Sequence, residues 1–298
     1  MADIGEHLFP MQKYRLTREV LLIKGEFGVE NFEEAYPISD EDLLRFHTPE
    51  YIRKLKEGSL TREEIDLLEL PYSAELFDTF LHHAGGTLQA CRLALRDGVA
   101  CNLGGGFHHA YPDHGEGLCM INDIAVAAQT LLDEGAVERI LILDLDVHQG
   151  NGNAFFFKNN DRVMTFSMHC ESIYPDEKET GGMNIDLPDG IGEDEYMDTL
   201  RSYYFTLFDD FFPQLVIYVA GADVYENDTV GKLNLTIPGI MHRDEGVFWE
   251  AASRCIPIVS LAAGGYARSI DDIIKIHANT IRAADTAAVI FRCQSRST

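Results

Sequence analysis

Residues 139–153 read RILILDLDVHQGNGN, and this stretch decides the class of fold. Its first half, RILILDL, is a short aliphatic and β-branched run, which is typical of a buried parallel strand. Its second half is crowded with Asp, His, Gln, Asn and Gly. In open α/β sheets, ligands bind beyond the carboxyl ends of the strands. The stretch therefore predicts a strand and, directly after it, a functional site.

Similar apolar runs recur along the chain and alternate with helical segments. The runs lie at residues 163–168 (VMTFSM), 215–221 (LVIYVAG) and 256–263 (IPIVSLAA), and helices are expected near residues 73–97, 122–135, 194–211, 242–253 and 269–285. This alternation predicts an α/β fold with a doubly wound sheet and helices on both faces. Because no repeat, low-complexity tract or linker interrupts the chain, we expect residues 1–298 to form a single domain.

The composition predicts a soluble globular protein. The chain has 298 residues and 46% hydrophobic content, enough for one large core. Every apolar run is far shorter than the roughly 20 residues of a membrane helix, so we expect no membrane insertion. Six cysteines without CxxC spacing indicate reduced thiols rather than disulfides or a thiolate zinc site. The start MADIGEHLFP has no basic segment followed by an apolar one, which predicts a cytoplasmic protein without a secretory signal.

The charge balance limits the kinds of molecule that the protein is expected to bind. With 49 acidic and 24 basic residues the formal net charge is -25, which repels nucleic acid and predicts no direct nucleic-acid binding. The same charge either serves solubility alone or attracts cationic substrates. The sequence gives no indication of the oligomeric state.

Acidic side chains and a histidine cluster after two of the apolar runs. Asp144, Asp146 and His148 alternate, so an extended backbone would direct all three to one side. Close carboxylates repel each other unless a cation or hydrogen bonds compensate, and Asp with His suits Zn²⁺ or, alternatively, Fe²⁺. Without a metal, Asp144 would cap the next segment and His148 would be a hydrogen-bonded loop residue. Asp223 follows the run 215–221 and would complete a three-ligand site with a position open for water.

Two adjacent histidines form a second candidate group. His108 and His109 follow three glycines, residues 104–106, directly after the run VACNL. Glycines allow positive φ and close backbone approach, so this turn can push both imidazoles into a cleft. Beside water activated by a metal, such a pair is suited to be general base and general acid. The alternative, a phosphate-binding loop, lacks the GK[ST] or GxGxxG that would follow.

Tyr266 completes the candidate chemistry. It follows Gly264 and Gly265 at the end of the last apolar run, where a phenol could donate a hydrogen bond to a developing oxyanion. Taken alone, a buried tyrosine at a strand end is more often explained by packing.

Together these motifs resemble the zinc-dependent histone deacetylase family, particularly its class IV and bacterial amidohydrolase branches. The resemblance rests on motifs in the same order over nearly the whole chain: GEHLFPMQKY (5–14), HTPEYIRKL (47–55), NLGGGFHHA (102–110), GLCMINDIAVA (117–127), LDLDVHQGNGN (143–153), TFSMH (165–169), AGADVYEND (220–228) and AGGY (263–266). It implies a three-layer α/β/α domain around a central, mostly parallel sheet of eight strands. Relatives usually have a short strand before GEHLFP, so a reduced sheet edge is expected here.

The resemblance also implies residue roles. Asp146, His148 and Asp223 would hold the metal, and water activated there would attack an amide. His109 would be the general base and acid, with His108 as its electrostatic companion oriented by Asp144. Tyr266 would hold the carbonyl oxygen and then the tetrahedral oxyanion. Asn151 stands where many relatives carry an aspartate behind the second histidine, and an amide polarises His109 less than a carboxylate would.

A structural potassium ion and a substrate channel are further implications. The potassium would be bound by the main-chain carbonyls of Asp144, Asp146 and His148, with the Asp144 carboxylate, Ser167 and the carbonyl of Met168. Many relatives line the channel with two phenylalanines. The matching positions here are Leu118 and Tyr174, with Val230 near the rim and Gly117 and Gly265 in the walls. These differences leave the acyl length open.

The leading hypothesis is hydrolysis of N-acyl-lysine in a protein or peptide. The rivals are hydrolysis of small acylamines such as acetylpolyamines, which the negative charge would attract equally well, and a silent module that binds acyl-lysine without hydrolysis. Arginase-like ureohydrolases are disfavoured, because Gly150 stands where their second metal would need another aspartate.

Overall fold

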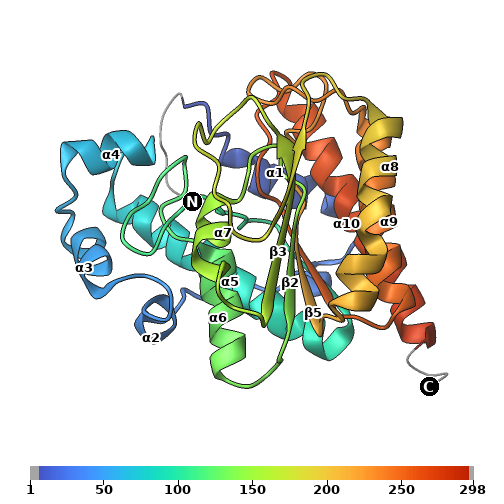
Figure 1. Ribbon diagram of the computed structural model, residues 1–298, viewed down its shortest axis with the longest axis horizontal. Coiled ribbons are helices and arrows are strands. Elements are labelled where there is room, and N and C mark those ends of the chain that lie inside the picture. Colours follow the sequence, from blue (N-terminus) through green and yellow to red (C-terminus); the bar gives the residue numbers. More distant parts are fainter. Residues whose placement is uncertain (1–6, 295–298) are drawn as a thin grey trace.

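The computed structural model describes residues 7–294, which form a six-stranded parallel sheet with helices on both faces (Figure 1). The strand order is β1-β6-β5-β2-β3-β4. The strands are β1 Val99–Asn102, β2 Ile140–Asp144, β3 Val163–Cys170, β4 Met183–Leu187, β5 Leu215–Val219 and β6 Ile258–Leu261. The four apolar runs and the VACNL run all became strands, which confirms the α/β class. Residues 1–6, where the reduced sheet edge was expected and from which the lack of a secretory signal was predicted, lie outside the described residues.

The expected count of eight strands was wrong for the described residues, which contain six. The count came from the resemblance, whereas the apolar pattern itself indicated fewer strands. Elsewhere in residues 7–294 the pairing is reduced to isolated bridges, such as Gly192 with Asn234 and Tyr225 with Leu235. A single bridge lacks the consecutive ladder hydrogen bonds that would extend it into a strand.

The five expected helices are present: α5 Ala74–Asp97, α6 Asp123–Asp133, α8 Glu193–Tyr204, α9 Ile237–Ser253 and α10 Ile270–Gln294. A π-helical turn, Phe205–Asp210, continues α8. Helix α9 begins five residues before the expected position, because Thr236 accepts a hydrogen bond from the Gly239 amide and Pro238 occupies the first turn. The sequence pattern had not indicated α1 Gln12–Ile23, α2 Asp40–Leu43, α3 Pro49–Glu57, α4 Arg62–Leu68, α7 Asn151–Phe157 or the short 3₁₀ turn Val29–Asn31.

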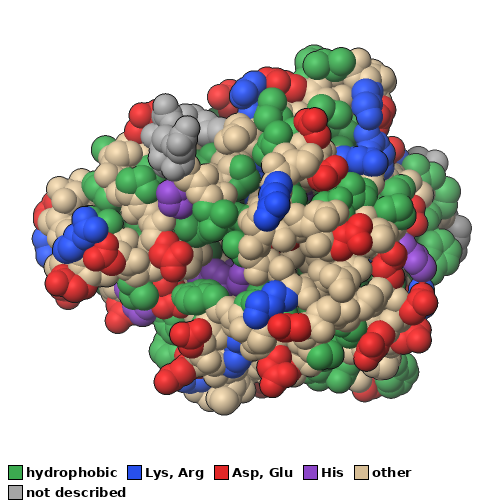
Figure 2. Space-filling view, turned by 90° about the horizontal axis from the view of Figure 1, so that it is seen from above, with side chains coloured by type: hydrophobic (Ala, Val, Ile, Leu, Met, Phe, Trp, Pro, Cys, Tyr) green, Lys and Arg blue, Asp and Glu red, His purple; other side chains and the backbone are tan. Residues whose placement is uncertain are grey.

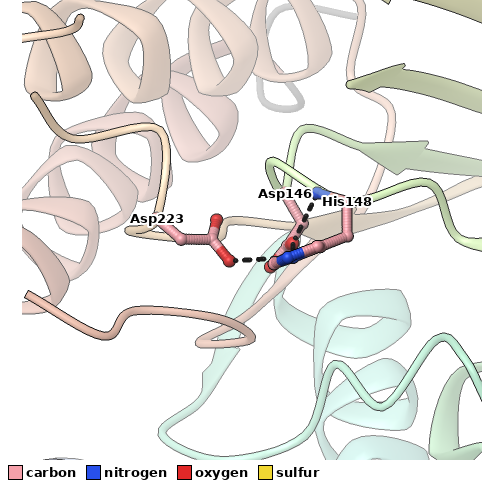
Figure 3. A group of neighbouring side chains, drawn as sticks. All are labelled: Asp146, His148 and Asp223. Atoms are coloured by element: carbon pink, nitrogen blue, oxygen red, sulfur yellow. Dashed lines mark hydrogen bonds and ion pairs between the residues drawn. The ribbon is translucent and has the colours of Figure 1, made fainter. Parts of the chain in front are cut away.

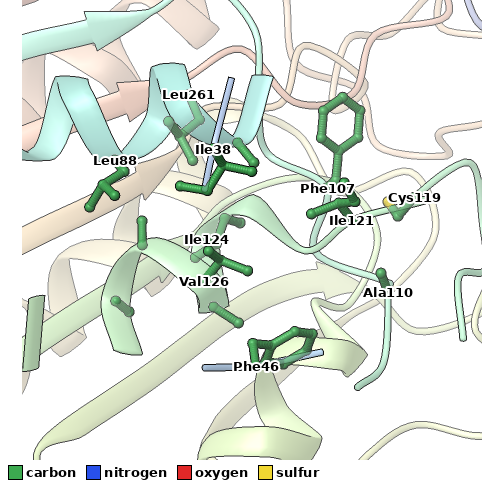
Figure 4. Close-up of a cluster of buried hydrophobic side chains, with 14 of the residues drawn as sticks. Ile38, Phe46, Leu88, Phe107, Ala110, Cys119, Ile121, Ile124, Val126 and Leu261 are labelled. Carbon is green, nitrogen blue, oxygen red and sulfur yellow. The ribbon is translucent and has the colours of Figure 1, made fainter. Parts of the chain in front are cut away.

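The two faces of the sheet bury separate apolar clusters, which gives the three layers. On β2, Ile140 and Ile142 belong to the cluster under α5 and α6, whereas Leu141 and Leu143 belong to the cluster under α8, α9 and α10. Figure 4 shows part of the first cluster, with Leu88 of α5 near Leu261 of β6. All five β2 residues are buried, and each fully buried aliphatic side chain stabilises the fold by about 1.5–3 kcal/mol.

The state of the cysteines and the length and apolarity of the helices were also predicted from the composition. All six cysteines lie within residues 7–294 and are free thiols. Across the same residues, no helix combines the length and the apolarity needed to cross a bilayer.

A buried polar cluster ties α9 to the ends of β2 and β5. Arg243 is 0% exposed, and its Nε donates to Asp244 Oδ1 at 2.8 Å. Its Nη1 donates to the main-chain carbonyls of Leu145 at 3.1 Å and Gly221 at 3.0 Å. Asp244 also accepts hydrogen bonds from Tyr218 and Thr280. The guanidinium therefore fixes the two segments that lead from the sheet into the loops described next.

Replacing Arg243 should destabilise the fold strongly. Arg243→Met leaves the Asp244 carboxylate buried without its cation, which should lower the free energy of unfolding by about 3–5 kcal/mol. The control is Arg254→Met, because Arg254 pairs with Asp209 and Glu250 while its side chain is 30% exposed, and it should cost at most about 1 kcal/mol. Urea unfolding measures both changes, and equal losses would show that the buried cluster contributes nothing special.

Candidate active site

The candidate site lies beyond the carboxyl ends of three neighbouring strands, β6, β5 and β2. Asp146 and His148 follow β2, Asp223 follows β5, and Tyr266 follows β6. Parallel strands end at the same edge of the sheet, so these loops converge. Figure 3 shows Asp146 and His148 on one loop pointing toward Asp223 on another.

Asp146, His148 and Asp223 form a group that could hold a metal ion, with one ligand atom from each within 4.8 Å of the others. His148 Nδ1 lies 3.0 Å from Asp146 Oδ1 and 3.4 Å from Asp223 Oδ2. The two carboxylates are at most 1% exposed. Within residues 7–294, Asp223 Oδ2 accepts no hydrogen bond. A buried carboxylate oxygen of this kind has a lone pair available to bind a cation.

The electrostatics of this group are unfavourable without a cation. Burial and the neighbouring Asp146 carboxylate raise the pKa of Asp223 to about 7. Burial opposes the charge on His148, but the hydrogen bond to Asp146 and the neighbouring Asp223 carboxylate raise the pKa of His148 to about 10. The protein thus holds a proton where two carboxylates meet, and a divalent ion would replace it. Oxygen and imidazole donors fit Zn²⁺ or Fe²⁺.

Gly264 closes the site from the third loop. Its amide donates to Asp146 Oδ2 at 2.9 Å. A Cβ atom on Gly264 would lie 1.9 Å from Asp223 Oδ2 and 2.5 Å from Asp146 Oδ2. Any larger residue at position 264 would therefore clash with the two carboxylates.

His108 and His109 lie beside this group with their Nε2 atoms 3.1 Å apart. His108 Nδ1 is 2.7 Å from Asp144 Oδ2, and His109 Nδ1 is 2.7 Å from Asn151 Oδ1. Burial lowers the pKa of His109 well below its usual value, and His108 and His148 lower it further. Burial also acts against charge on His108, but Asp144 outweighs it and raises the pKa of His108. The two imidazoles are thus driven toward different protonation states, as expected for a base and its charged companion.

The turn that presents both histidines depends on Gly106, whose φ is +92°. A Cβ atom there would lie 2.6 Å from Ala263 Cβ. The amides of Gly106 and Phe107 donate to the buried carboxylate of Asp123 at the start of α6. This carboxylate fixes the turn against the helix.

Tyr266 lines the active-site cavity and is held in place by its backbone. Its amide donates to Asp228 Oδ2 at 2.7 Å, and its carbonyl accepts from Thr229 Oγ1 at 2.6 Å. Burial raises the pKa of Tyr266 well above its usual value, so the phenol keeps its proton. The Lys13 ammonium lies 5.6 Å from the ring centroid. It also donates to the Ala263 carbonyl at 2.6 Å, and burial lowers the pKa of Lys13 to about 8.

A cavity of about 240 Å³ leads to these residues. Figure 2 shows histidine side chains recessed between hydrophobic ones. The expected channel residues Gly117, Leu118, Tyr174 and Val230 all line it. Gly265 does not, since a Cβ there would point into the interior, 3.1 Å from Ala222 and 3.2 Å from Ile273. The walls instead include residues that the sequence had not singled out: Leu8, Phe9, Glu69, Phe107, Cys119, Ile173 and Ala263.

The residues expected to bind potassium also come together. Asp144 lies opposite Ser167 in the pairing of β2 with β3, and Met168 follows on β3. Ser167 Oγ is 2.9 Å from His169 Nδ1, so the hydroxyl already has one partner. The potassium site stays a prediction.

Comparisons with known proteins agree with this geometry. A model of the histone deacetylase domain matches residues 7–281. An uncharacterized protein of Picosynechococcus is 39% identical over 94% of this chain and 93% of its own. Histone deacetylase 2 of Arabidopsis thaliana is 31% identical over 90% of this chain and 72% of its own, and a probable deacetylase of Archaeoglobus fulgidus is 32% identical over 86% and 76%.

The fold has a counterpart among solved structures. The crystal structure of a histone deacetylase homologue from Aquifex aeolicus superposes with a TM-score of 0.79, covering 94% of this chain and 80% of that one at 23% identity. A parallel sheet with a buried Asp-His-Asp group and paired histidines at its strand ends has the side chains of a hydrolytic site that could hold a metal ion. The chain belongs to the histone deacetylase family. It is accordingly a hydrolase of the deacetylase kind.

Filling the space at Gly264 should weaken metal binding. Gly264→Ala puts a methyl group against both carboxylates, so the affinity for Zn²⁺ should fall by about 10- to 100-fold, as for other disturbances of groups around metal ligands. The control is Gly192→Ala, where a Cβ would meet nothing within 4 Å. Competition with a chelator measures the affinity. If both variants bind Zn²⁺ equally, these three side chains are not the ligands.

Proposed function

We propose that the protein hydrolyses N-acyl-lysine in peptides or proteins to free lysine and a carboxylate. The observation that carries this proposal is the buried Asp146, His148 and Asp223 group beside a neutral His109, with Asp146, His148 and His109 lining the cavity. Much of the cavity wall is apolar, with Leu118, Ile173 and Val230 among its residues. Such walls suit an uncharged acyl chain and the aliphatic stem of a lysine.

Asp146, His148 and Asp223 would hold the metal, with Zn²⁺ as the expected ion and Fe²⁺ as the alternative. A divalent ion bound there supplies Lewis acidity, which activates water and polarises the amide carbonyl. The Asp223 oxygen that accepts no hydrogen bond and the raised pKa values of Asp223 and His148 support this assignment. K⁺ would bind around Asp144, Ser167 and Met168.

His109 is positioned to accept a proton from the attacking water, because its imidazole is neutral and buried beside the ligand group. It then returns the proton to the leaving amine. His108 is held by Asp144 and stabilises negative charge that develops nearby. Tyr266 lines the cavity and donates its phenolic hydrogen to the oxyanion, which its raised pKa allows.

The extent of the family match supports a single catalytic domain. The match covers residues 7–281, and the two clusters of the core pack on opposite faces of one sheet.

The net charge of -25 favours a cationic substrate. Both lysine-rich peptides and small acylated polyamines are cationic.

The first test is carboxylate release from matched acetyl-, octanoyl- and myristoyl-lysine peptides by the zinc-loaded protein. Turnover should fall by about 10²–10⁴-fold in His109→Ala, because the base is lost. The acyl series reports the length that the channel accepts. Turnover of acetylspermidine, measured in parallel, distinguishes hydrolysis of small acylamines from hydrolysis of acyl-lysine peptides. Binding of acyl-lysine without any turnover would leave only the silent binding module.

A second test removes one hydroxyl group. Tyr266→Phe keeps the ring and loses the oxyanion donor, so kcat should fall by about 10²–10³-fold while KM changes little. Tyr225→Phe is the matched control, because Tyr225 is also buried near a strand end but hydrogen bonds outward to Asp272. An unchanged kcat in Tyr266→Phe would remove Tyr266 from the mechanism.

A further inference from the structure

The side-chain amide behind His109 can face it in two ways. Asn151 presents an oxygen, which accepts a hydrogen, on one side and an NH₂ group, which donates, on the other. If the oxygen faces His109 Nδ1, the imidazole carries its hydrogen on Nδ1 and keeps a lone pair on Nε2. If the NH₂ group faces it, the hydrogen moves to Nε2. A base needs the first arrangement. An asparagine alone does not dictate it, and His108 Nε2, which lies 3.1 Å from His109 Nε2, favours it only while His108 is protonated.

Glu116 occupies the far side of this amide. Its Oε1 accepts from Asn151 Nδ2 at 2.6 Å and from the Tyr174 hydroxyl at 2.5 Å. Its Oε2 lies 3.3 Å from His114 Nε2. The Glu116 side chain is only 12% exposed, so these contacts are largely shielded from water.

The carboxylate is held in its ionised form. Burial opposes ionisation, yet hydrogen bonds from His114, Tyr174 and Asn151 keep the pKa of Glu116 below its usual value. An ionised carboxylate accepts hydrogen bonds and donates none. The amide end that faces Glu116 must therefore be the NH₂ group.

A second neighbour reinforces this orientation. The Tyr111 hydroxyl donates to Glu179 Oε1 at 3.0 Å, so its oxygen can accept from Asn151 Nδ2, which lies 3.4 Å away. Both groups on that side are thus acceptors. The amide oxygen is left to face His109 Nδ1, where the distance is 2.7 Å.

We propose that Glu116 is a positioning residue that orients the Asn151 amide and thereby fixes the tautomer in which His109 acts as the base. Glu116 thus places a carboxylate behind the Asn151 amide, which itself contacts His109. It also holds the Tyr174 ring, which packs edge-on against His109 with the centroids 4.9 Å apart. The proposal rests on the proposed function for the role of His109.

The direct test reads the tautomer of His109. In the zinc-loaded protein with ¹⁵N-labelled histidine, the imidazole shifts near neutral pH distinguish hydrogen on Nδ1 from hydrogen on Nε2, and loss of the signals in His109→Ala assigns them. The wild type should show the Nδ1–H form. Glu116→Leu should give a mixture of forms, because the amide then keeps only its long 3.4 Å contact with the Tyr111 hydroxyl on that side. Glu116→Gln should keep the Nδ1–H form, because its amide oxygen can still accept from Asn151.

Activity should follow the tautomer. Glu116→Leu should lower kcat by about 10- to 100-fold, the range found when a partner behind a metal-ligating side chain is removed, whereas Glu116→Gln should lower kcat by at most about threefold. The matched control is Glu179→Gln, which alters a carboxylate bonded to Tyr111 in the same network but not to Asn151. It should leave the tautomer unchanged.

A double-mutant cycle tests the orientation without any apolar substitution. Asn151→Asp puts a second carboxylate against Glu116, so kcat should fall through like-charge repulsion. Adding Glu116→Gln to that variant should restore activity, because the glutamine amide can donate to the new carboxylate. The effect of Glu116→Gln would thus change sign between the two backgrounds.

The outcomes separate this inference from the proposed function. An unchanged His109 tautomer in Glu116→Leu, or no change of sign in the cycle, overturns the positioning role even if kcat falls. A tautomer that responds to Glu116→Leu in a protein that turns over no acyl-lysine peptide supports the positioning role and overturns the function. If Glu116→Leu does not fold, the cycle, whose variants remain polar, decides.

Discussion

The structure depends on one electrostatic constraint, which is that Asp146 and Asp223 are buried side by side. Two carboxylates at most 1% exposed repel each other unless positive charge lies between them. His148 provides a proton when no ion is bound, and a divalent ion would provide more charge in the same space. Gly264 leaves that space open and donates an amide hydrogen to Asp146. The loops after β2, β5 and β6 thus meet at a place that needs a positive charge.

Around this group the three histidines have different partners and therefore different chemistry. His148 faces two carboxylates, His108 faces the carboxylate of Asp144, and His109 faces the neutral amide of Asn151. The side chain behind each imidazole decides whether it carries charge, although all three lie within one polar cluster. A base beside a charged companion follows from the difference between Asp144 and Asn151.

Much of this arrangement could be predicted from the sequence, because apolar runs and strand-end polar residues are local signals. The four runs, the five main helices and the Asp146, His148 and Asp223 group were found that way. The strand count was not, since it came from relatives and the extra pairing is reduced to isolated bridges. Glu116 and Lys13 were also missed. Their partners, Asn151 and Ala263, lie 35 and 250 positions away, and no local pattern reports such contacts.

The hydrogen bonds of Arg243 have a consequence for which residues can change near the site. The guanidinium binds the main-chain carbonyls of Leu145 and Gly221 rather than their side chains. A hydrogen bond to the backbone is indifferent to residue type, so position 145 can change among apolar residues of similar volume while the loop stays in place. The apolar residue at position 145 can therefore change without moving the loop, as long as the guanidinium keeps its contacts with the two carbonyls. In this way one buried arginine preserves the spacing of Asp146 and Asp223.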